Sequence, residues 1–491
     1  MNIKTILEKK FQPRSIPIFP VVEEIPGDLE TPVSAFLKLK KYGAKFLLES
    51  VEMGEKLGRY SFIGLEPRIK IKITEENLIL EENGLKCTLP FEQEDPLLSL
   101  KKILETFSIE KTDFPRLLGG LVGYLSYDYV RFLEKIPNHT TESLNLPLGL
   151  FYLVDRLIVF DHLQRKIKIV SLTDGDSPVK IGKERKRIAE VIELLNSPLE
   201  IEKSMLKTSF DEICSNFSQE EFCQRVLKAQ EYIKSGDIYQ LVLSQRLAGN
   251  TRANPFQIYR ALRMLNPSPY MFYLDFEDFK LVGSSPEVLV KLENGTALVR
   301  PIAGTRPRGL TEEEDLKLTQ ELLSNEKEKA EHIMLVDLGR NDLGRCCQFG
   351  TLKVNDLMTV EKYSHVMHMV SQVEGKLNSG QDQFALFKAA FPAGTVSGAP
   401  KIRSMQIIEE LEKEKRGPYA GAVGYFSLTG NMDMCITIRT IILKAEKASH
   451  RFFLQGGAGI VFDSLPEKEY QESLNKIEAL KKAIKMAEKE F

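Results

Sequence analysis

The chain has 491 residues, of which 43% are hydrophobic and 28% charged, as in an ordinary soluble globular protein of about three average domains. The net charge of -2 gives no reason to expect a nucleic acid or an anionic membrane as a partner. No apolar run approaches the roughly 20 residues that span a bilayer, and the N-terminal segment MNIKTILEKKFQPRS lacks the apolar core of a secretion signal. The six cysteines are scattered and form no CxxC pair. They indicate reduced thiols, and therefore a cytoplasmic protein.

Segments with the composition of β-strands occur on both sides of a central connector. They are rich in β-branched residues, and helix-like segments at 220–236 and 381–391 lie between them. The strand-like segments are 68–73, 156–160, 166–170, 238–247, 279–285, 287–292, 420–428 and 435–443. Because strands and helices do not alternate regularly, the pattern predicts an α+β protein with large, mostly antiparallel sheets.

The connector is marked by a change in composition from about Asp174 to Asn216. It begins with the turn-like sequence TDGDSP, continues with the basic segment KIGKERKRIAEVIELL and ends in a charged stretch. The basic segment is typical of a helix with one solvated face and its Ile and Leu residues packed inward. We therefore expect an N-terminal region at 1–173, a connector at 174–216 and a C-terminal region at 217–491.

The segment SNEKEKAEHIMLVDLGRND predicts a helix whose acids lie in line with an apolar stripe. Glu328 and Glu331 lie one turn apart, and Leu335 and Leu338 continue the same face. Burying a dense polar group without partners is costly, so the polar residues after the apolar run need partners. These residues are Asp337, Arg340, Asn341 and Asp342.

The segment QGGAGIVFDSLPEKEYQESLNK, from Gln455 to Lys476, predicts a glycine-rich loop followed by a second acidic helix. Glycines at 456, 457 and 459 allow a ligand to approach the backbone closely, because no Cβ stands in the way. Ser464 and Glu467 have capping-box spacing, and Pro466 is tolerated only in a first helical turn, so the helix starts near Leu465. Its buried stripe is expected at Tyr470, Leu474, Ile477 and Ile484.

The flank of this second helix carries Glu469, Glu472 and Lys476. Facing the first acidic helix, it would bring several carboxylates to one hard cation. Carboxylates without a cysteine or histidine cluster favour Mg²⁺ or Mn²⁺ over Zn²⁺. A solvated helix edge with an internal salt bridge explains the second helix equally well, so both interpretations stay open. The HxxH pair His365 and His368 lies in the valine-rich segment YSHVMHMVSQV, which favours a strand with the two rings on opposite faces, and so no shared metal.

Six segments that combine glycine with proline, with charge or with both occur one after another over the C-terminal three-fifths of the chain. They are GSSPEVLV, RPIAGTRPRG, AEHIMLVDLGRND, FPAGTVSGAPK, GPYAGAVGY and GGAGIVFDSLPEKEYQE. In this order they resemble the chorismate-utilising enzymes, and LLESVEMGEKLGRYSFIG resembles the N-terminal region of anthranilate synthase large subunits. The resemblance implies a pair of packed antiparallel sheets flanked by helices, and an enzyme that acts on chorismate with Mg²⁺.

The resemblance also implies roles for individual residues. Glu331 and Glu472 match metal-binding glutamates, supported by Glu328 and Glu469. Glu287 matches a general acid for the departing 4-hydroxyl, and His368 matches a base for the aromatising step. In isolation, Glu287 would be an ordinary acid at the start of a helix or a strand. Thr395 matches a threonine that contacts the substrate. The further substrate-contacting positions are Gly304, Thr305, Tyr419, Arg439, Gly457, Ala458, Gly459 and Lys476.

Two positions distinguish the members of this family. Isochorismate- and salicylate-forming members carry a water-activating lysine where this chain has Gln240, and a neutral amide cannot act as a general base. Aminodeoxychorismate-forming members carry a nucleophilic lysine where this chain has Ala303. Both departures favour the anthranilate-forming members, which carry out the first committed step of tryptophan biosynthesis. The alternatives are aminodeoxychorismate synthesis and a catalytically silent, amino-acid-binding regulator.

The resemblance further implies partners for the chain. Ammonia would come from a separate glutamine amidotransferase subunit, because no amidotransferase-like cysteine context is present. Feedback inhibition by L-tryptophan is expected at a pocket that combines two segments matching the inhibitor site of the family. Its residues are Glu49, Ser50, Pro269, Tyr270 and Met271.

Overall fold

The computed structural model describes residues 16–50, 58–91, 93–109, 114, 116–200, 213–362 and 366–490. His365, residues 51–57 of the N-terminal motif and residues 201–212 of the predicted connector lie outside the described residues. None of the described helices combines the length and the apolar composition that crossing a bilayer requires.

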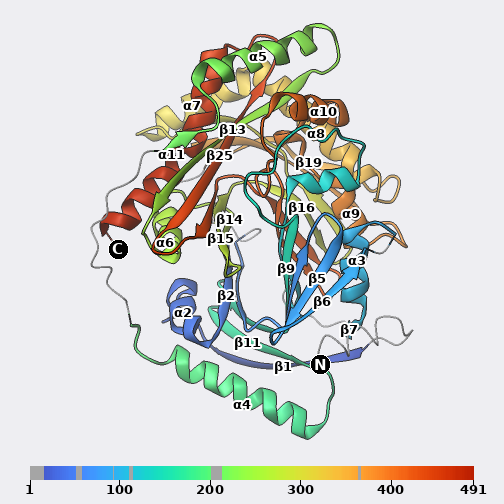
Figure 1. Cartoon of the computed structure of the whole chain (residues 1–491), viewed down its shortest axis with the longest axis vertical. Helices are drawn as coiled ribbons and strands as arrows, with labels where there is room; N and C mark the ends of the chain where they lie inside the picture. Colours follow the sequence, from blue (N-terminus) through green and yellow to red (C-terminus); the bar gives the residue numbers. More distant parts are fainter. Residues whose placement is uncertain are drawn as a thin grey trace.

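Two large β-sheets form the centre of the molecule (Figure 1). The first has 13 strands, in the order β12 (Cys214–Ser215), β13 (Gln240–Thr251), β25 (His450–Ile460), β24 (Thr440–Ala445), β15 (Phe279–Ser285), β14 (Tyr270–Asp275), β2 (Ala44–Glu49), β3 (Tyr60–Leu65), β10 (Arg156–Asp161), β11 (Lys166–Thr173), β1 (Ile16–Pro26) and β7 (Phe107–Ile109), with β21 (Gly398–Ala399) paired to β13. The parallel pair β1–β7 is the exception among the described pairings of this sheet.

The second sheet has 12 strands. Their order is β18 (Ile302–Pro307), β20 (Val366–Lys376), β17 (Thr296–Val299), β16 (Val288–Glu293), β23 (Met432–Ile436), β22 (Ala422–Ser427), β8 (Gly120–Leu125), β9 (Gly149–Val154), β4 (Ile69–Ile73), β5 (Asn77–Glu82) and β6 (Leu85–Pro90), with β19 (Lys353–Lys362) paired to β20. The expected α+β fold with two mostly antiparallel sheets flanked by helices is therefore confirmed.

The sheets pack face to face through the largest hydrophobic cluster, which contains residues of both. Phe62 of the first sheet meets Tyr425 of the second with ring centroids 6.0 Å apart. Tyr152 of the second sheet lies 5.5 Å from Phe276, which follows β14. Aromatic rings in contact at such distances supply much of the apolar area that holds two sheets together.

Helices cover the outer surfaces. α2 (Pro32–Leu39), α4 (Pro178–Leu195), α6 (Pro255–Leu265) and α11 (Pro466–Glu490) pack on the first sheet through a second cluster. α5 (Gln219–Lys234) and α10 (Lys401–Leu411) share a third cluster at the end of β13 and β25. α3 (Pro96–Glu105), α7 (Glu312–Ser324), α8 (Glu326–Gly344) and α9 (Gln383–Ala390) border the second sheet.

Both the N-terminal and the C-terminal regions contribute strands to both sheets. β2 of the N-terminal region pairs with β14, so that Glu49 lies opposite Met271. β8 pairs with β22 in the same way in the second sheet. The division of the chain at 1–173, 174–216 and 217–491 stays a prediction. The basic helix that was predicted within the connector is present as α4, and its Ile188, Val191 and Leu195 are buried.

The prediction of a glycine-rich loop at residues 456–459 is wrong. Gly456, Gly457 and Gly459 belong to the strand β25, which pairs with β13 over its whole length. The glycines permit close packing: a Cβ on Gly456 would lie 2.6 Å from the carbonyl oxygen of Ser473 in α11. α11 begins at Pro466 as expected, and the Ser464 hydroxyl accepts the N–H of Val461, which ties the end of β25 to the helix.

Candidate active site

A cavity of about 350 Å³ collects most of the predicted site residues, where the ends of β13, β18, β20 and β25 meet α8 and α11. A volume in this range suits a small-molecule ligand. The described lining residues are Gln240, Val242, Pro286, Glu287, Ile302, Ala303, Thr305, Lys327, Glu331, Leu335, His368, Thr395, Val396, Tyr419, Ile438, Arg439, Gly457, Gly459, Val461, Glu469, Glu472 and Lys476. Of the predicted catalytic, substrate and metal residues, Gly304, Ala458 and Glu328 do not line it.

Glu287 supplies an acid that keeps its proton at neutral pH. It lies between β15 and β16, directly before Val288, and its backbone carbonyl accepts the N–H of Ile436 at 3.0 Å, which fixes it against β23. Burial raises the pKa of its carboxyl to about 8, against the opposing effects of Thr395, Lys476 and Arg439. A protonated carboxyl in a cavity can donate a proton to a leaving group.

His368 of β20 supplies a neutral imidazole to the same cavity. Its Nδ1 lies 3.2 Å from the carbonyl oxygen of Gly304 and 3.0 Å from Oγ1 of Thr305. A carbonyl can only accept, so Nδ1 carries the hydrogen, and in the neutral ring Nε2 carries the lone pair. Burial lowers the pKa of His368 from its ordinary value. Neutrality and this tautomer make the ring a base at Nε2. Gly304 acts through its carbonyl, at a φ of 62° that suits glycine.

Two cations face the cavity from neighbouring elements. Arg439 has a φ of 50°, an unusual conformation for a residue with a Cβ. Among the described residues its guanidinium has no hydrogen-bond or ion-pair partner, so its donors are available to a carboxylate. Lys476 of α11 contacts Oε1 of Glu472 at 2.7 Å and donates to the carbonyl oxygen of Gly457 at 2.9 Å. The predicted salt bridge within α11 is thus present, and it borders the cavity.

The open edge of β25 forms another wall. Its pairing with β24 ends at Leu454, so the strand continues past Gly457 and Gly459 with that edge turned toward the cavity. A Cβ on Gly457 would lie 2.9 Å from the Tyr419 hydroxyl, and one on Gly459 would lie 2.9 Å from Nε2 of Gln240. The glycines therefore bring Tyr419 and Gln240 against the strand. Ala458 points to the other side and is fully buried in the third cluster.

The predicted metal ligands approach the cavity from α8 and α11. Glu331, Glu469 and Glu472 line it, and burial raises the pKa of Glu469. Glu331 accepts a hydrogen bond from Gln240 at 3.0 Å. Glu328 faces away: its Oε1 is held by Arg306 at 2.7 Å, and its buried Oε2 has no hydrogen-bond partner in the described residues. Sequence spacing placed Glu328 and Glu331 on one face, whereas Arg306 of β18 binds the Glu328 carboxyl, which lies against Gly304 and not in the cavity lining.

The donor set fits a hard divalent cation. Within the described ranges, no three acidic, histidine or cysteine side chains converge closely enough to hold an ion by themselves. Mg²⁺ does not require this, because it is commonly held by one or two carboxylates and completes its shell with water and substrate oxygens. Glu331 of α8 and Glu472 of α11 line the same cavity as Arg439 and Lys476, and they offer two such carboxylates.

Lys327 lines the cavity but was missed in the sequence analysis. It lies one turn before Glu331 on α8, and its ammonium pairs with Asp463 at 2.9 Å, which joins α8 to the loop before α11. The i, i+4 spacing from Glu331 could have indicated it.

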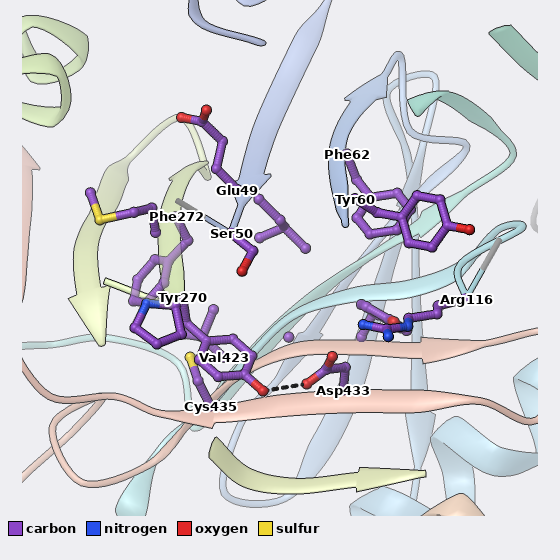
Figure 2. A pocket seen from close by; sticks show the side chains of 15 residues that line it. Glu49, Ser50, Tyr60, Phe62, Arg116, Tyr270, Phe272, Val423, Asp433 and Cys435 are labelled. Carbon is purple, nitrogen blue, oxygen red and sulfur yellow. Dashed lines mark hydrogen bonds between the residues drawn. The ribbon is translucent and has the colours of Figure 1, made fainter. Parts of the chain in front are cut away.

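A second cavity, of about 60 Å³, brings together all five predicted inhibitor residues (Figure 2). Figure 2 shows the Ser50 hydroxyl directed into the space beside Tyr270, while the buried Glu49 carboxyl points away from this space. Arg263 and Tyr259 bind that carboxyl. The buried Ser50 hydroxyl has no hydrogen-bond partner among the described residues, so it is available to a ligand. The other residues that line this second cavity include Tyr60, Phe62, Arg116, Tyr425 and Asp433.

The two cavities are joined by strands. Tyr270, which donates to Asp433 at 2.9 Å in the second cavity, lies opposite Ser285 in the β14–β15 pair. Ser285 comes two residues before Glu287. Ser284 donates its backbone N–H to the carbonyl oxygen of Arg439 at 3.1 Å. Movement of β14 in the second cavity would therefore reach both Glu287 and Arg439.

Comparison with known proteins defines the class. The model of the chorismate binding enzyme family matches residues 44–482, and the chain belongs to this family. Within the family it is similar to curated proteins named anthranilate synthase component 1: it is 47% identical to that of Acetivibrio thermocellus and 47% identical to that of Aquifex aeolicus, each over 99% of both chains. These relatives place the chain with component 1 of anthranilate synthase.

One solved structure agrees with this placement, and a second shows the fold. The crystal structure of anthranilate synthase component I from Streptococcus pneumoniae matches with a TM-score of 0.77 and 38% identity, over 93% of this chain and 99% of that one. The menaquinone-specific isochorismate synthase of Escherichia coli shares the fold, with a TM-score of 0.70 and 20% identity over 98% of each chain.

Proposed function

We propose that this chain converts chorismate and ammonia to anthranilate and pyruvate. The observation that carries the proposal is one cavity holding a buried acid that is protonated at neutral pH, Glu287, and a neutral imidazole, His368. Arg439 and Lys476 face the same space and suit the two carboxylates of chorismate.

The first step adds ammonia to ring carbon C2 as the 4-hydroxyl leaves. Glu287 donates its proton to the departing hydroxyl, which leaves as water, and the new ammonium group at C2 releases a proton. Two features favour ammonia as the nucleophile. Gln240 is a neutral amide that cannot activate water, and Ala303 offers no nucleophile of its own.

The second step removes the proton from C2. Nε2 of His368 takes this proton while the bond from the ring to the enolpyruvyl oxygen breaks and the ring becomes aromatic. The departing enolate takes up a proton at its terminal carbon and becomes pyruvate. Arg439, Lys476 and the open edge of β25 hold the carboxylates throughout, so that the acid and the base meet the right atoms.

Mg²⁺ is the cation that we propose for Glu331 and Glu472, with Glu469 beside them; when bound, it neutralises the ring carboxylate and orients the ring. We expect Glu331→Gln to weaken binding of Mn²⁺, a spectroscopic substitute, at least tenfold in the presence of chorismate, because one of two anionic ligands becomes neutral. Electron paramagnetic resonance measures this directly. Glu326→Gln, on the exposed side of the same helix, is the matched control and should leave Mn²⁺ affinity unchanged. Equal affinity in both variants would remove Glu331 from the metal site.

Ammonia is proposed to come from a separate glutamine amidotransferase, as the component 1 names of the relatives suggest. The six free thiols support a reducing compartment, and we propose the cytoplasm.

L-Tryptophan is the proposed inhibitor at the second cavity. About 60 Å³ is well below the roughly 150 Å³ that accommodates a benzene ring. An indole therefore enters only if lining side chains move, and β14 passes that movement to Glu287 and Arg439. The inhibitor thus favours a conformation in which Glu287 is displaced from its catalytic position.

The second cavity can be tested through its free hydroxyl. We expect Ser50→Ala to raise the tryptophan concentration for half-maximal inhibition about tenfold, because one hydrogen bond to the ligand is lost. Calorimetric titration of tryptophan should show the same loss of affinity. If inhibition of the variant equals that of the wild type, tryptophan does not use this hydroxyl.

A further inference from the structure

A buried ion pair lies directly behind the wall of the catalytic cavity, and the reaction as described does not use it. Arg416 is 2% exposed and Glu412 is 7% exposed. The guanidinium grips the carboxylate with two bonds, from Nη2 to Oε1 at 2.7 Å and from Nε to Oε2 at 2.9 Å. The two residues lie four positions apart in the non-helical segment that follows α10.

The remaining donors of Arg416 hold two segments of the cavity wall. Nη1 donates to the carbonyl oxygen of Val396 at 2.6 Å, and Nη2 donates to that of Val242 at 2.8 Å. Val396 ends the short 3₁₀ helix η3 (Gly394–Val396), which carries Thr395 next to Glu287. The same guanidinium therefore fixes the Thr395 turn to β13, and the N–H of Val242 adds a bond to the Ser397 carbonyl at 3.0 Å.

Glu412 extends this connection to β25, the strand that carries Gly456, Gly457 and Gly459. Its Oε1 accepts the backbone N–H of Ser244 at 2.9 Å and the Ser244 hydroxyl at 2.8 Å. Gln455 of β25 donates in turn to that hydroxyl at 2.9 Å. The ion pair thus reaches η3, β13 and β25, which are three of the elements that line the cavity.

Tyr419 is also held by this group. The Arg416 guanidinium lies 4.7 Å from the ring centre of Tyr127 and 5.7 Å from that of Tyr419, within the range of cation–π contact. The Tyr419 hydroxyl lies beside Gly457 in the cavity. Arg416 therefore fixes a second lining side chain by packing against its ring.

Stability alone does not account for such a pair. Replacing a buried ion pair by apolar residues of similar volume is often neutral or stabilising. What apolar residues cannot supply is a planar fork of fixed donors that reaches a carboxylate and two backbone carbonyls at once. We propose that Arg416, oriented by Glu412, is a positioning residue for the chorismate reaction, which holds Thr395 and Tyr419 against the substrate; this inference rests on the proposed function.

Arg416→Lys is the direct test, because it keeps the charge and loses the fork. We expect kcat to fall about 100-fold, the effect of misplacing reacting groups by about 1 Å, with the chorismate KM changed less than threefold. The matched control is Arg131→Lys. Arg131 pairs with the buried Glu409 at 2.7 Å, one turn before Glu412, and neither residue lines the cavity. This control should lower the melting temperature and leave kcat within twofold.

A double-mutant cycle separates positioning from general stability. If Arg416 acts through Thr395, Thr395→Val should cost much less in the Arg416→Lys background than in the wild type, since the hydroxyl is already misplaced. Additive losses, or a kcat for Arg416→Lys as high as that of the Arg131→Lys control, would overturn the inference. Rates are followed both as chorismate consumed and as anthranilate formed. A wild type that consumes chorismate without forming anthranilate refutes the proposed function, while the cycle still judges Arg416 on chorismate consumption.

Discussion

Replacement of Glu287 by glutamine should lower kcat for anthranilate formation by about 10³-fold, within the range for loss of a general acid. Glutamine has nearly the same shape but cannot protonate the departing 4-hydroxyl. Stopped-flow and steady-state assays of anthranilate fluorescence measure the loss. Activity within tenfold of the wild type would mean that another group, or water, is the acid.

The same substitution should make the protein more stable, which separates chemistry from misfolding. Burial raises the pKa of Glu287 from 4.5 to about 8, so the folded protein holds a proton that the unfolded chain releases. The contribution of protonated Glu287 to the free energy of unfolding is therefore fully present below pH 4.5 and is lost as the pH rises toward 8. At pH 7 this loss is on the order of 3 kcal/mol, and replacement of Glu287 by glutamine removes it. Denaturant unfolding at pH 5 and pH 7.5 should show a much larger gain in stability for the variant at the higher pH.

The pH profile of the wild type should reflect both groups. The rate should fall as the pH rises through about 8, where Glu287 loses its proton. It should also fall at a pH below 6.5, where His368, whose pKa is lowered by burial, becomes protonated. Because the supply of free NH₃ itself rises with pH, rates should be compared at constant NH₃ concentration. A single limb in either direction would contradict the pairing of acid and base.

Replacement of His368 by asparagine should change the product as well as the rate. Asparagine can keep a hydrogen bond to the Gly304 carbonyl but provides no base. Addition of ammonia then proceeds, removal of the C2 proton slows by about 10² to 10⁴-fold, and the aminodeoxyisochorismate intermediate accumulates. Chromatography of the reaction mixture should show this intermediate with little anthranilate or pyruvate.

The control for this variant is His332→Asn. That histidine is fully buried on α8, bonds to Ser371 and lies outside the cavity lining. Its loss should affect stability and leave the ratio of intermediate to anthranilate as in the wild type. If His368→Asn slows chorismate consumption and anthranilate formation equally, without an intermediate, His368 is not the base of the second step.

The sequence allowed the fold class and most of the cavity to be predicted, because the motifs carry glycine, proline and charge in a distinctive order. It did not allow the secondary structure of the glycine-rich segment to be predicted, which is a strand and not a loop. Glycine usually weakens strands, and only the structure shows that β13, α11 and Tyr419 press against Gly456 and Gly457 closely enough to require it.

Contacts from distant parts of the chain account for the other differences. Helical spacing placed Glu328 beside Glu331, but Arg306, some 22 residues earlier, binds its carboxyl. The partner of Glu331, Gln240, and the fork of Arg416 on Val242 and Val396 join segments far apart in sequence. No periodicity or local propensity encodes such pairs, so they become visible only when the sheets bring the segments together.

The central claim is tested most directly by incubating the purified chain with chorismate, Mg²⁺ and ammonium at mildly alkaline pH, with and without L-tryptophan, while fluorescence and a coupled assay follow anthranilate and pyruvate. The account predicts that both products appear in equal amounts and that both fall when tryptophan is added. Consumption of chorismate to aminodeoxychorismate, or a folded protein that leaves chorismate unchanged, would contradict it.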